Sequence, residues 1–411
     1  MMKKSFPLTG IPLEDIKKQL KVPNDYISED SVFLGYPQSM PHPLGVEIFT
    51  EYLSYNENHV GVFTNTDKVQ NISRQLEKEL IEMMGQLYGD INIDGYVTSG
   101  GTEGNIMGVW IARNYFEGNI CLFKTELTHQ SIEKACNIMK ILDVSDIPYT
   151  ENYQMDIDCL KESIIKKIDS GVLNFIVVCT AGYTMTGTKD SVVDIDHMLQ
   201  TLSEKYKANF YIHVDAAIGG LVFPFISNEE FAFACKYVYS LSVDPHKMGY
   251  IPFSAGIFMC RQGMQKYIEI PIKYAKKVMD KTLINSRNAA AAVACWGVFN
   301  YLGKSGFSAK LHQLILVKEY LIKKLEKSNL AEIISDPGTN MLCVHFLNRN
   351  GGCLPEIIEK KYVLDGFYLF YKCQKIMCYK IYIMPHVTQG ALDHFVNDLK
   401  IAFKGEIDEY E

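Results

Sequence analysis

A proline, a histidine and a lysine follow one another directly after an apolar run, in the stretch SVDPHKMGY over residues 242–250. The preceding residues, KYVYSL, are rich in β-branched and aromatic side chains, which predicts a strand that ends shortly before Lys247. Open α/β sheets bind ligands beyond the carboxyl ends of their strands. Whether Lys247 is a reactive amine or only a charge therefore depends on the other groups at that edge.

The stretch VTSGGTEGN, residues 97–105, combines two glycines with two hydroxyl side chains between a predicted strand and a predicted helix. Gly100 and Gly101 allow a ligand to approach the backbone closely, and the start of the helix offers free N–H groups. This combination suits a phosphate. Ser99 is a further candidate ligand of that phosphate. A capped helix after a glycine turn explains the same residues equally well, because no complete nucleotide-binding motif is present.

Asp215 lies at the end of the predicted strand in YIHVDAAIGGLVFPF, residues 211–225. A buried carboxylate needs a partner. The small residues that follow, including Ala217, leave room for a flat ligand, and Asp215 could pair with a protonated ring nitrogen. An aspartate that caps a loop is the less favoured alternative.

Two further strand ends carry polar side chains. His129 lies in THQSIEKA, residues 128–135, and becomes informative only if an aromatic ligand lies nearby on which it can stack. Thr180 lies in CTAGYTMTG, residues 179–187, and could be either a turn hydroxyl or a ligand contact.

A flat, phosphorylated ring with a carbonyl group would account for all of these groups at once. Pyridoxal 5′-phosphate (PLP) is such a ligand. In this interpretation Lys247 forms a Schiff base with its aldehyde, Asp215 holds its ring nitrogen, and the glycine turn holds its phosphate. No single motif proves the interpretation.

The elements that would position these groups are predicted as strands over 95–98, 119–124, 174–179, 210–214, 237–243 and 255–261, which alternate with helices such as 69–88. This alternation predicts an α/β fold with a mostly parallel sheet. After a helix that starts near Ala289, residues 310–327 predict another helix, residues 340–347 and 380–385 predict strands, and residues 388–403 predict a final helix. We therefore divide the chain into an N-terminal segment (1–50), a large domain (51–299) and a smaller C-terminal α+β domain (300–411).

The bulk composition narrows the function. The 411 residues are 47% hydrophobic and 22% charged, which is typical of a globular protein. A net charge of −7 and a pI near 5.9 argue against a nucleic-acid partner. No stretch predicts a membrane span or a signal peptide. The 11 cysteines have neither metal-site nor redox-motif spacing, so we expect a cytoplasmic protein with reduced thiols and no metal.

The ordered motifs SGGTEGN, DAAIGG, DPHK and IMPHV (383–387), with His129 between the first two, resemble the group II PLP-dependent amino-acid decarboxylases. They are most similar to the archaeal tyrosine/aspartate decarboxylase branch of that family. The resemblance extends from about residue 25 to 403.

The resemblance implies the aspartate-aminotransferase fold and a homodimer whose active sites are shared between subunits. It implies that Lys247 is the Schiff-base lysine, Asp215 the partner of the ring nitrogen, and His129 and Ala217 the residues on the two ring faces. Thr180 would lie beside the ring. Ser99, Gly100 and Gly101 would hold the phosphate, aided by Asp244 or His246. Tyr274, in PIKYAKK, would donate a proton to Cα after CO2 leaves; a surface tyrosine is its alternative.

Lys380 replaces an arginine that the family pattern predicts before IMPHV, and a lysine lacks the planar fork of an arginine. We expect decarboxylation of an L-amino acid, with an aromatic, tyrosine-like substrate favoured. Aspartate, histidine and glutamate are alternatives, since FLGYP (33–37) is also similar to bacterial histidine decarboxylases. A lyase similar to sphingosine-phosphate lyase, an aldehyde-forming oxidase and a protein without catalytic activity are further alternatives.

Overall fold

The computed structural model describes residues 12–19, 32–37, 40–62, 71–227, 231–273 and 279–408. In this part of the chain, the central sheet has seven strands in the order β2-β8-β7-β6-β5-β3-β4. Strand β8 is antiparallel to both of its neighbours, and the other pairs are parallel. The strands are β2 (Ile93–Thr98), β3 (Ile120–Thr125), β4 (Val144–Ile147), β5 (Asn174–Thr180), β6 (Asn209–Asp215), β7 (Val238–Val243) and β8 (Gly256–Arg261). The six strands predicted here are confirmed, and β4 is an addition.

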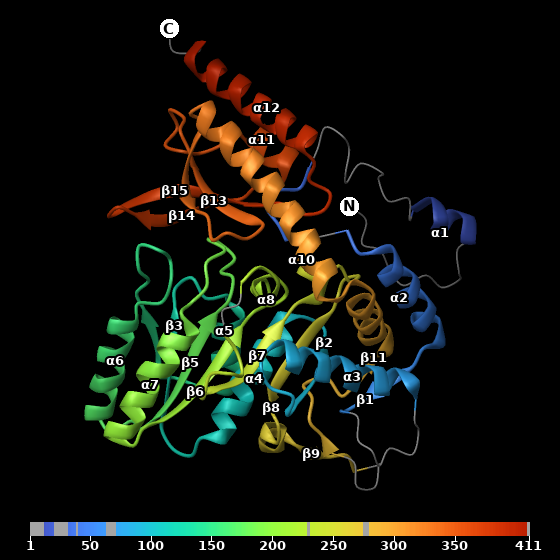
Figure 1. The fold of residues 1–411 in the computed structure, drawn as a ribbon, viewed down its shortest axis with the longest axis vertical. Helices are drawn as coiled ribbons and strands as arrows, with labels where there is room; N and C mark the ends of the chain where they lie inside the picture. Colours follow the sequence, from blue (N-terminus) through green and yellow to red (C-terminus); the bar gives the residue numbers. More distant parts are fainter. Residues whose placement is uncertain are drawn as a thin grey trace.

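Helices cover both faces of this sheet (Figure 1). Successive residues of β5 show why, because Phe175 and Val177 belong to one apolar core whereas Ile176 and Val178 belong to the other. Strands buried on both faces are expected in a parallel sheet. The surrounding helices are α3 (Ile72–Leu87), α4 (Gly101–Tyr115), α5 (Ser131–Met139), α6 (Ile157–Asp169) and α7 (Val192–Tyr206), and they include the helix predicted over 69–88.

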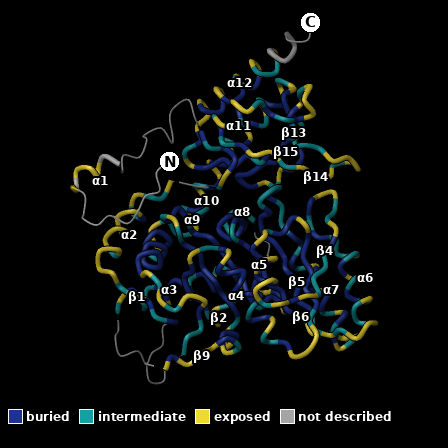
Figure 2. The backbone as a smooth tube through the Cα atoms, turned by 180° about the vertical axis from the view of Figure 1, so that it is seen from behind, coloured by how far each residue is buried: buried dark blue, intermediate teal, exposed yellow. Residues whose placement is uncertain are grey.

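Different helices pack against the two faces of the sheet and close the two apolar cores. Helices α4 and α5 close the smaller core, to which Ile106 and Ile132 contribute. Helices α3, α6 and α7 close the larger core, which continues into the C-terminal part of the chain. Figure 2 shows this continuity as buried backbone that extends from the sheet toward α11 (Glu356–Tyr362) and α12 (Gln389–Asp408).

Short elements connect and flank these layers. Strand β1 pairs with β11 in antiparallel register, so that His59 lies opposite Arg287. Helix α2 packs along α10. The elements are α1 (Leu13–Gln19), α2 (Pro43–Tyr55), β1 (Asn58–Val60), η2 (Gly219–Leu221), α8 (Phe223–Ile226), α9 (Pro245–Met248), η3 (Met264–Ile268), β9 (Ile270–Pro271), β10 (Met279–Asp280) and β11 (Ser286–Asn288).

Helix α10 (Ala289–Lys327) leads from the central sheet to the C-terminal part, which lies above the sheet in Figure 1. Gly303 interrupts it with non-helical backbone angles, so the helix predicted over 310–327 is the second half of α10. The C-terminal sheet is antiparallel, with the order β12-β13-β15-β14. Its strands are β12 (Ala331–Ser335), β13 (Met341–Phe346), β14 (Gly366–Tyr371) and β15 (Gln374–Tyr382). Strands β12 and β14 were not predicted.

Among the described residues, no helix is both long and apolar enough to span a bilayer.

Candidate active site

The carboxyl ends of β2, β3, β5, β6 and β7 meet at one edge of the central sheet, where they surround a cavity of about 260 Å³. Parallel strands bring their carboxyl ends to the same edge, so motifs that are far apart in the sequence become neighbours. The cavity is lined by every cofactor-binding residue predicted above: Ser99, Gly100, Gly101, His129, Thr180, Asp215, Ala217, Asp244, His246 and Lys247.

Lys247 lies on the short helix α9, just beyond the end of β7, and pairs with the residue that caps this helix. Its Nζ is 3.0 Å from Oδ2 of Asp244. The Asp244 side chain is buried, whereas the Lys247 side chain is partly exposed to the cavity. His246 is also held, since its Nδ1 is 2.6 Å from the carbonyl oxygen of Ala255. Burial lowers the pKa of His246 below its ordinary value.

The glycine turn connects β2 to α4 and lies directly against Asp244. A methyl group added at Gly101 would lie 3.0 Å from Oδ2 of Asp244 and 3.1 Å from Cβ of Ala217. Gly100 has φ of 151°, a region that favours glycine. The N–H and the hydroxyl of Ser99 donate to Oε2 of the buried Glu103, over 2.8 and 2.9 Å. The Ser99 hydroxyl hydrogen therefore already has an acceptor, which leaves the backbone N–H groups at the start of α4 as phosphate donors.

Asp215 ends β6 and is almost fully buried. Its Oδ1 accepts from the N–H of Ala217 at 3.1 Å, and its Oδ2 accepts from Nδ2 of Asn105 at 2.7 Å. His129 follows β3, and its Nδ1 is 2.8 Å from Oγ of Ser131. Burial lowers the pKa of His129, although the charge of Asp215 acts in the opposite direction. A neutral imidazole is therefore expected near pH 7.

Asp190 holds the loop after β5 in place. This buried carboxylate accepts from the N–H of Thr180 at 2.7 Å and from the hydroxyl of Tyr183 at 2.8 Å. Both Thr180 and Tyr183 face the cavity. The loop is thus fixed by its own polar contacts, which leaves the Thr180 hydroxyl available to a ligand.

The residues of the cavity fit PLP. Within the described part of the chain, Oγ1 of Thr180 and Oδ1 of Asp244 are buried side-chain atoms with no hydrogen-bond partner. Side chains at Gly100 and Gly101 would narrow the cavity next to His246 and Asp244. Unpaired buried polar atoms beside a glycine cradle, a lysine amine and a buried carboxylate are what a phosphorylated pyridine aldehyde requires.

Several cavity residues were not predicted. Part of the cavity wall is formed by apolar and aromatic side chains, those of Leu127, Tyr183, Ile218 and Phe253. Asn105 also lines the cavity and contacts Asp215 directly. Asn105 lies within the motif SGGTEGN, but its role depends on residues more than 100 positions away. A single sequence gives no signal for such a contact.

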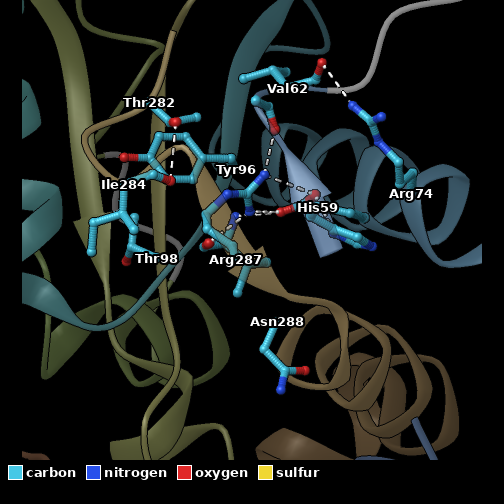
Figure 3. A network of polar contacts seen from close by, with 12 residues as sticks. His59, Val62, Arg74, Tyr96, Thr98, Thr282, Ile284, Arg287 and Asn288 are labelled. Carbon is cyan, nitrogen blue, oxygen red and sulfur yellow. Dashed lines mark hydrogen bonds and ion pairs between the residues drawn. The ribbon is translucent and has the colours of Figure 1, made fainter. Parts of the chain in front are cut away.

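A buried ionic cluster joins the back of β2 to β11. Arg287 donates to Oε1 of Glu77 at 2.5 Å and to the carbonyl oxygen of Val97 at 2.9 Å, and Glu77 also accepts from the N–H of Val97. Figure 3 shows the guanidinium of Arg287 close to His59 and beside the ring of Tyr96, 4.7 Å from its centroid. Because the Tyr96 hydroxyl donates to Glu103 at 2.9 Å, the cluster reaches the residue that anchors Ser99.

One predicted residue, Lys380, is not among the described residues that line this cavity. Tyr274 lies outside the described residues. Lys380 lies on β15, where its ammonium is 5.4 Å from the ring centroid of Tyr36 and 5.9 Å from that of Phe367. Two residues further along the strand, and therefore on the same face, the Tyr382 hydroxyl donates to the carbonyl oxygen of the cavity residue Thr184. Lys380 thus faces the same side of the C-terminal sheet as the cavity.

Comparisons with known proteins point to the same cofactor. The family model for the pyridoxal-dependent decarboxylase conserved domain matches residues 75–347. The probable L-tyrosine/L-aspartate decarboxylase of Methanococcus aeolicus is 29% identical over 402 residues, covering 94% of this chain and 97% of its own. The tryptophan decarboxylase of Clostridium sporogenes is 30% identical, covering 94% and 91%.

Among solved structures, the L-methionine decarboxylase of Streptomyces sp. 590 has the same fold, with a TM-score of 0.82 at 17% identity and 96% of each chain covered. The resemblance noted from the motifs, the expected fold class and the expected cofactor are therefore confirmed. The chain belongs to the pyridoxal-dependent decarboxylase family and is a PLP-dependent carboxy-lyase.

Proposed function

We propose that this enzyme decarboxylates an aromatic L-amino acid to its amine and CO2. One observation carries the chemistry: Lys247, the buried Asp215 and the glycine turn face a single cavity. The substrate class is supported by Leu127 and Phe253, which add an apolar and an aromatic side chain to a cavity wall that also contains polar residues.

Bound PLP supplies an electron sink for the electron pair that CO2 leaves behind on Cα. Asp215, as a buried acceptor with one donor on each oxygen, holds the proton of the ring nitrogen. Lys247 would present its own amine to the cofactor and would bind the cofactor again when the product amine leaves. Asp244 orients that amine through the 3.0 Å contact and, being a carboxylate, cannot itself donate to a phosphate.

The remaining cofactor contacts are assigned to residues of the cavity wall. His129 and Ala217 would pack against the two ring faces, and Thr180 would lie beside the ring. The N–H groups at the start of α4, with Gly100 and Gly101, hold the phosphate, which the positive end of the helix favours. His246 and Ser99 support this turn, Ser99 through its two hydrogen bonds to Glu103.

Tyr274 is the proposed proton donor to Cα. The residues on either side of its segment pair with each other, as β9 and β10. We also propose a homodimer with shared active sites and a cytoplasmic location. The location is consistent with the absence of disulfide bonds among the eleven cysteines, all of which the structure describes as free.

Lys380 is proposed to bind the α-carboxylate of the substrate as a point charge. Burial lowers its pKa, although nearby Asp365 acts in the opposite direction. Among the described residues that line the cavity, Lys247 is the only lysine or arginine. A second carboxylate, as in aspartate, would therefore compete with the α-carboxylate for Lys380, which favours a substrate with a neutral side chain.

The proposal is tested by incubating the purified protein and PLP with each of the twenty amino acids, and separately with a phosphorylated amino alcohol, and identifying the products by mass spectrometry. An aromatic amine formed together with CO2 is the expected result. Amine from aspartate, glutamate or histidine alone would overturn the substrate class. Aldehyde with peroxide would support the oxidase, and activity only on a phosphorylated amino alcohol would support the lyase.

A further inference from the structure

Asn105, in the second turn of α4, occupies the centre of a buried hydrogen-bond chain behind the cavity. Its Nδ2 is 2.7 Å from Oδ2 of Asp215 and 2.8 Å from Oγ of Ser131. Its Oδ1 is 3.0 Å from Nε2 of His213, whose Nδ1 is 2.8 Å from Oγ of Ser240. One side-chain amide therefore joins the carboxylate at the end of β6 to an imidazole in the middle of the same strand.

The hydrogen atoms in this series of hydrogen bonds have one consistent arrangement. Because an ionised carboxylate can only accept, the amide nitrogen of Asn105 must face Asp215. Its oxygen then faces His213, so Nε2 of His213 carries the proton and Nδ1 accepts from Ser240. At the other end, the N–H of Ser131 donates to Nδ1 of His129 at 3.3 Å, which leaves Nε2 of His129 for the ligand.

The side chain of His213 is closely packed between the sheet and α4. Its side chain is fully buried, and a methyl group added at Gly108 of α4 would lie 2.2 Å from its Nδ1. Burial lowers its pKa to about 4 against the raising effect of Asp215, so the ring is neutral near pH 7. A neutral imidazole with Nε2 protonated is the form that fixes the Asn105 amide.

We propose that Asn105 is a positioning residue for Asp215, and that the buried His213 acts through Asn105 by preventing its amide from turning over. If the amide turned, its oxygen would face the Asp215 carboxylate, and a donor would be replaced by a repulsive contact. Asp215 would then lose the geometry in which it meets a ring nitrogen. The inference rests on the role proposed for Asp215, and neither Asn105 nor His213 needs to touch the substrate.

The test is the affinity of the apo protein for PLP, followed by the absorbance of the bound cofactor, in Asn105→Ala and His213→Leu. Loss of a hydrogen bond to a charged group predicts a Kd for PLP that is weaker by about 10- to 100-fold in each variant. In the same variants kcat falls, whereas KM for the substrate stays within about threefold of wild type, since uniform substrate binding is intact.

Three matched variants distinguish positioning from a structural role. His213→Gln retains a donor toward Asn105 and is expected to restore most of the affinity that His213→Leu loses. The double variant Asn105→Ala/His213→Leu is expected to bind PLP no more weakly than Asn105→Ala, because His213 acts through the amide. Asn114→Leu, on the same helix, loses a 2.9 Å bond to the carbonyl oxygen of Tyr267 and a 2.9 Å bond from the neighbouring Arg113. Neither bond belongs to the group around Asp215, so this variant is expected to bind PLP normally.

The inference would be overturned if the losses of PLP affinity in the two single variants multiplied in the double variant. It would also be overturned if His213→Gln and His213→Leu bound PLP with equal affinity. If Asn105→Ala does not fold, Asn105→Asp preserves the side-chain volume and places a carboxylate against Asp215. It should bind PLP still more weakly, and wild-type affinity in Asn105→Asp would contradict the inference.

Asp215→Asn, measured in parallel, separates this inference from the proposal on which it rests. Wild-type affinity and turnover in Asp215→Asn would overturn the role of Asp215 itself. If PLP affinity and turnover are lost in Asp215→Asn but remain at wild-type levels in the Asn105 and His213 variants, only the positioning role would be overturned.

Discussion

The ammonium nitrogen of Lys247 lies 3.0 Å from Oδ2 of Asp244, whose other carboxylate oxygen is buried without a partner among the described residues. Asp244 occupies the N-cap position of the short helix that carries Lys247, and its carboxylate contacts the amine on that helix. The glycine turn lies against the same carboxylate. Lysine, carboxylate and glycine turn thus form one contiguous group.

Asp244→Asn is expected to lower kcat/KM by about 10- to 100-fold, because misplacing a reacting amine by a fraction of a bond length has costs of this order. Steady-state kinetics with the identified substrate measure the effect. Asp94→Asn is the control, since Asp94 lies at the opposite end of β2, where it accepts from the N–H of Gly263. Equal rates in wild type and Asp244→Asn would exclude the orienting role.

Gly101→Ala is expected to weaken PLP binding by about tenfold, because a contact of 3.0 Å forces Asp244 or the turn to shift. The melting temperature of the apo protein should fall only slightly, since the better helix propensity of alanine offsets part of the cost of that shift. Titration with PLP measures the affinity. Gly390→Ala, in the first turn of α12, is the matched control, because its nearest neighbour would be 3.9 Å away. Wild-type affinity for PLP in Gly101→Ala would contradict the role of the glycine turn in binding the cofactor.

Lys380→Met removes a charge at nearly constant length and is expected to reduce kcat/KM by about 10- to 100-fold, the effect of losing a charge-assisted contact. Lys380→Arg should retain most of the activity, because the charge is preserved. Kinetics of the two variants provide the measurement, with Lys375→Met on the same strand as the control. If the methionine variant matched wild type, another group would bind the α-carboxylate.

Acid is expected to destabilise the protein through Glu77. Burial raises the pKa of Glu77, but the charge of Arg287 and the hydrogen bond to His59 more than offset this and lower it to about 2. The folded pKa is below the ordinary value of 4.5, so this stabilisation is complete above pH 4.5 and is lost as the pH falls toward 2. The loss amounts to roughly 3 kcal/mol.

Urea unfolding between pH 6 and pH 3 measures this dependence. Glu77→Gln should flatten it and should destabilise the protein at neutral pH by about 3–5 kcal/mol, because Arg287 remains buried without its counter-ion. Glu82→Gln is the control on the same helix, since its partner Lys78 and Glu82 itself are both about half exposed. An unchanged pH dependence in Glu77→Gln would show that another carboxylate is responsible.

The strands and the cavity could be predicted because both depend on local patterns. Short apolar runs rich in β-branched and aromatic residues, such as residues 174–179, favour strands, and a parallel sheet then brings the residues after each strand to one edge. Lys247, Asp215, His129 and the glycine turn needed only this rule to become neighbours. Strand β12 is short and contains the charged Glu332, which weakens its pattern. The aromatic run FYLFY of β14 does carry a strand signal, which the prediction above does not include.

The polar contacts behind the cavity could not be predicted in the same way. Asn105 and His213 are 108 positions apart, and Glu77 and Arg287 are 210 apart. Such pairs depend on the way in which a helix packs on a sheet, and a single sequence carries no periodic signal for them. The identity of the substrate depends similarly on the shape of the cavity wall, to which Tyr183 and Phe253 contribute from separate loops.

The central claim is that Lys247 and bound PLP remove CO2 from an amino acid. It is tested most directly by measuring CO2 and amine in the same reaction mixture, with wild type and with Lys247→Ala. The account predicts one CO2 for each amine from wild type and no turnover above background from the folded variant. Amine without CO2, or wild-type turnover in Lys247→Ala, would contradict it.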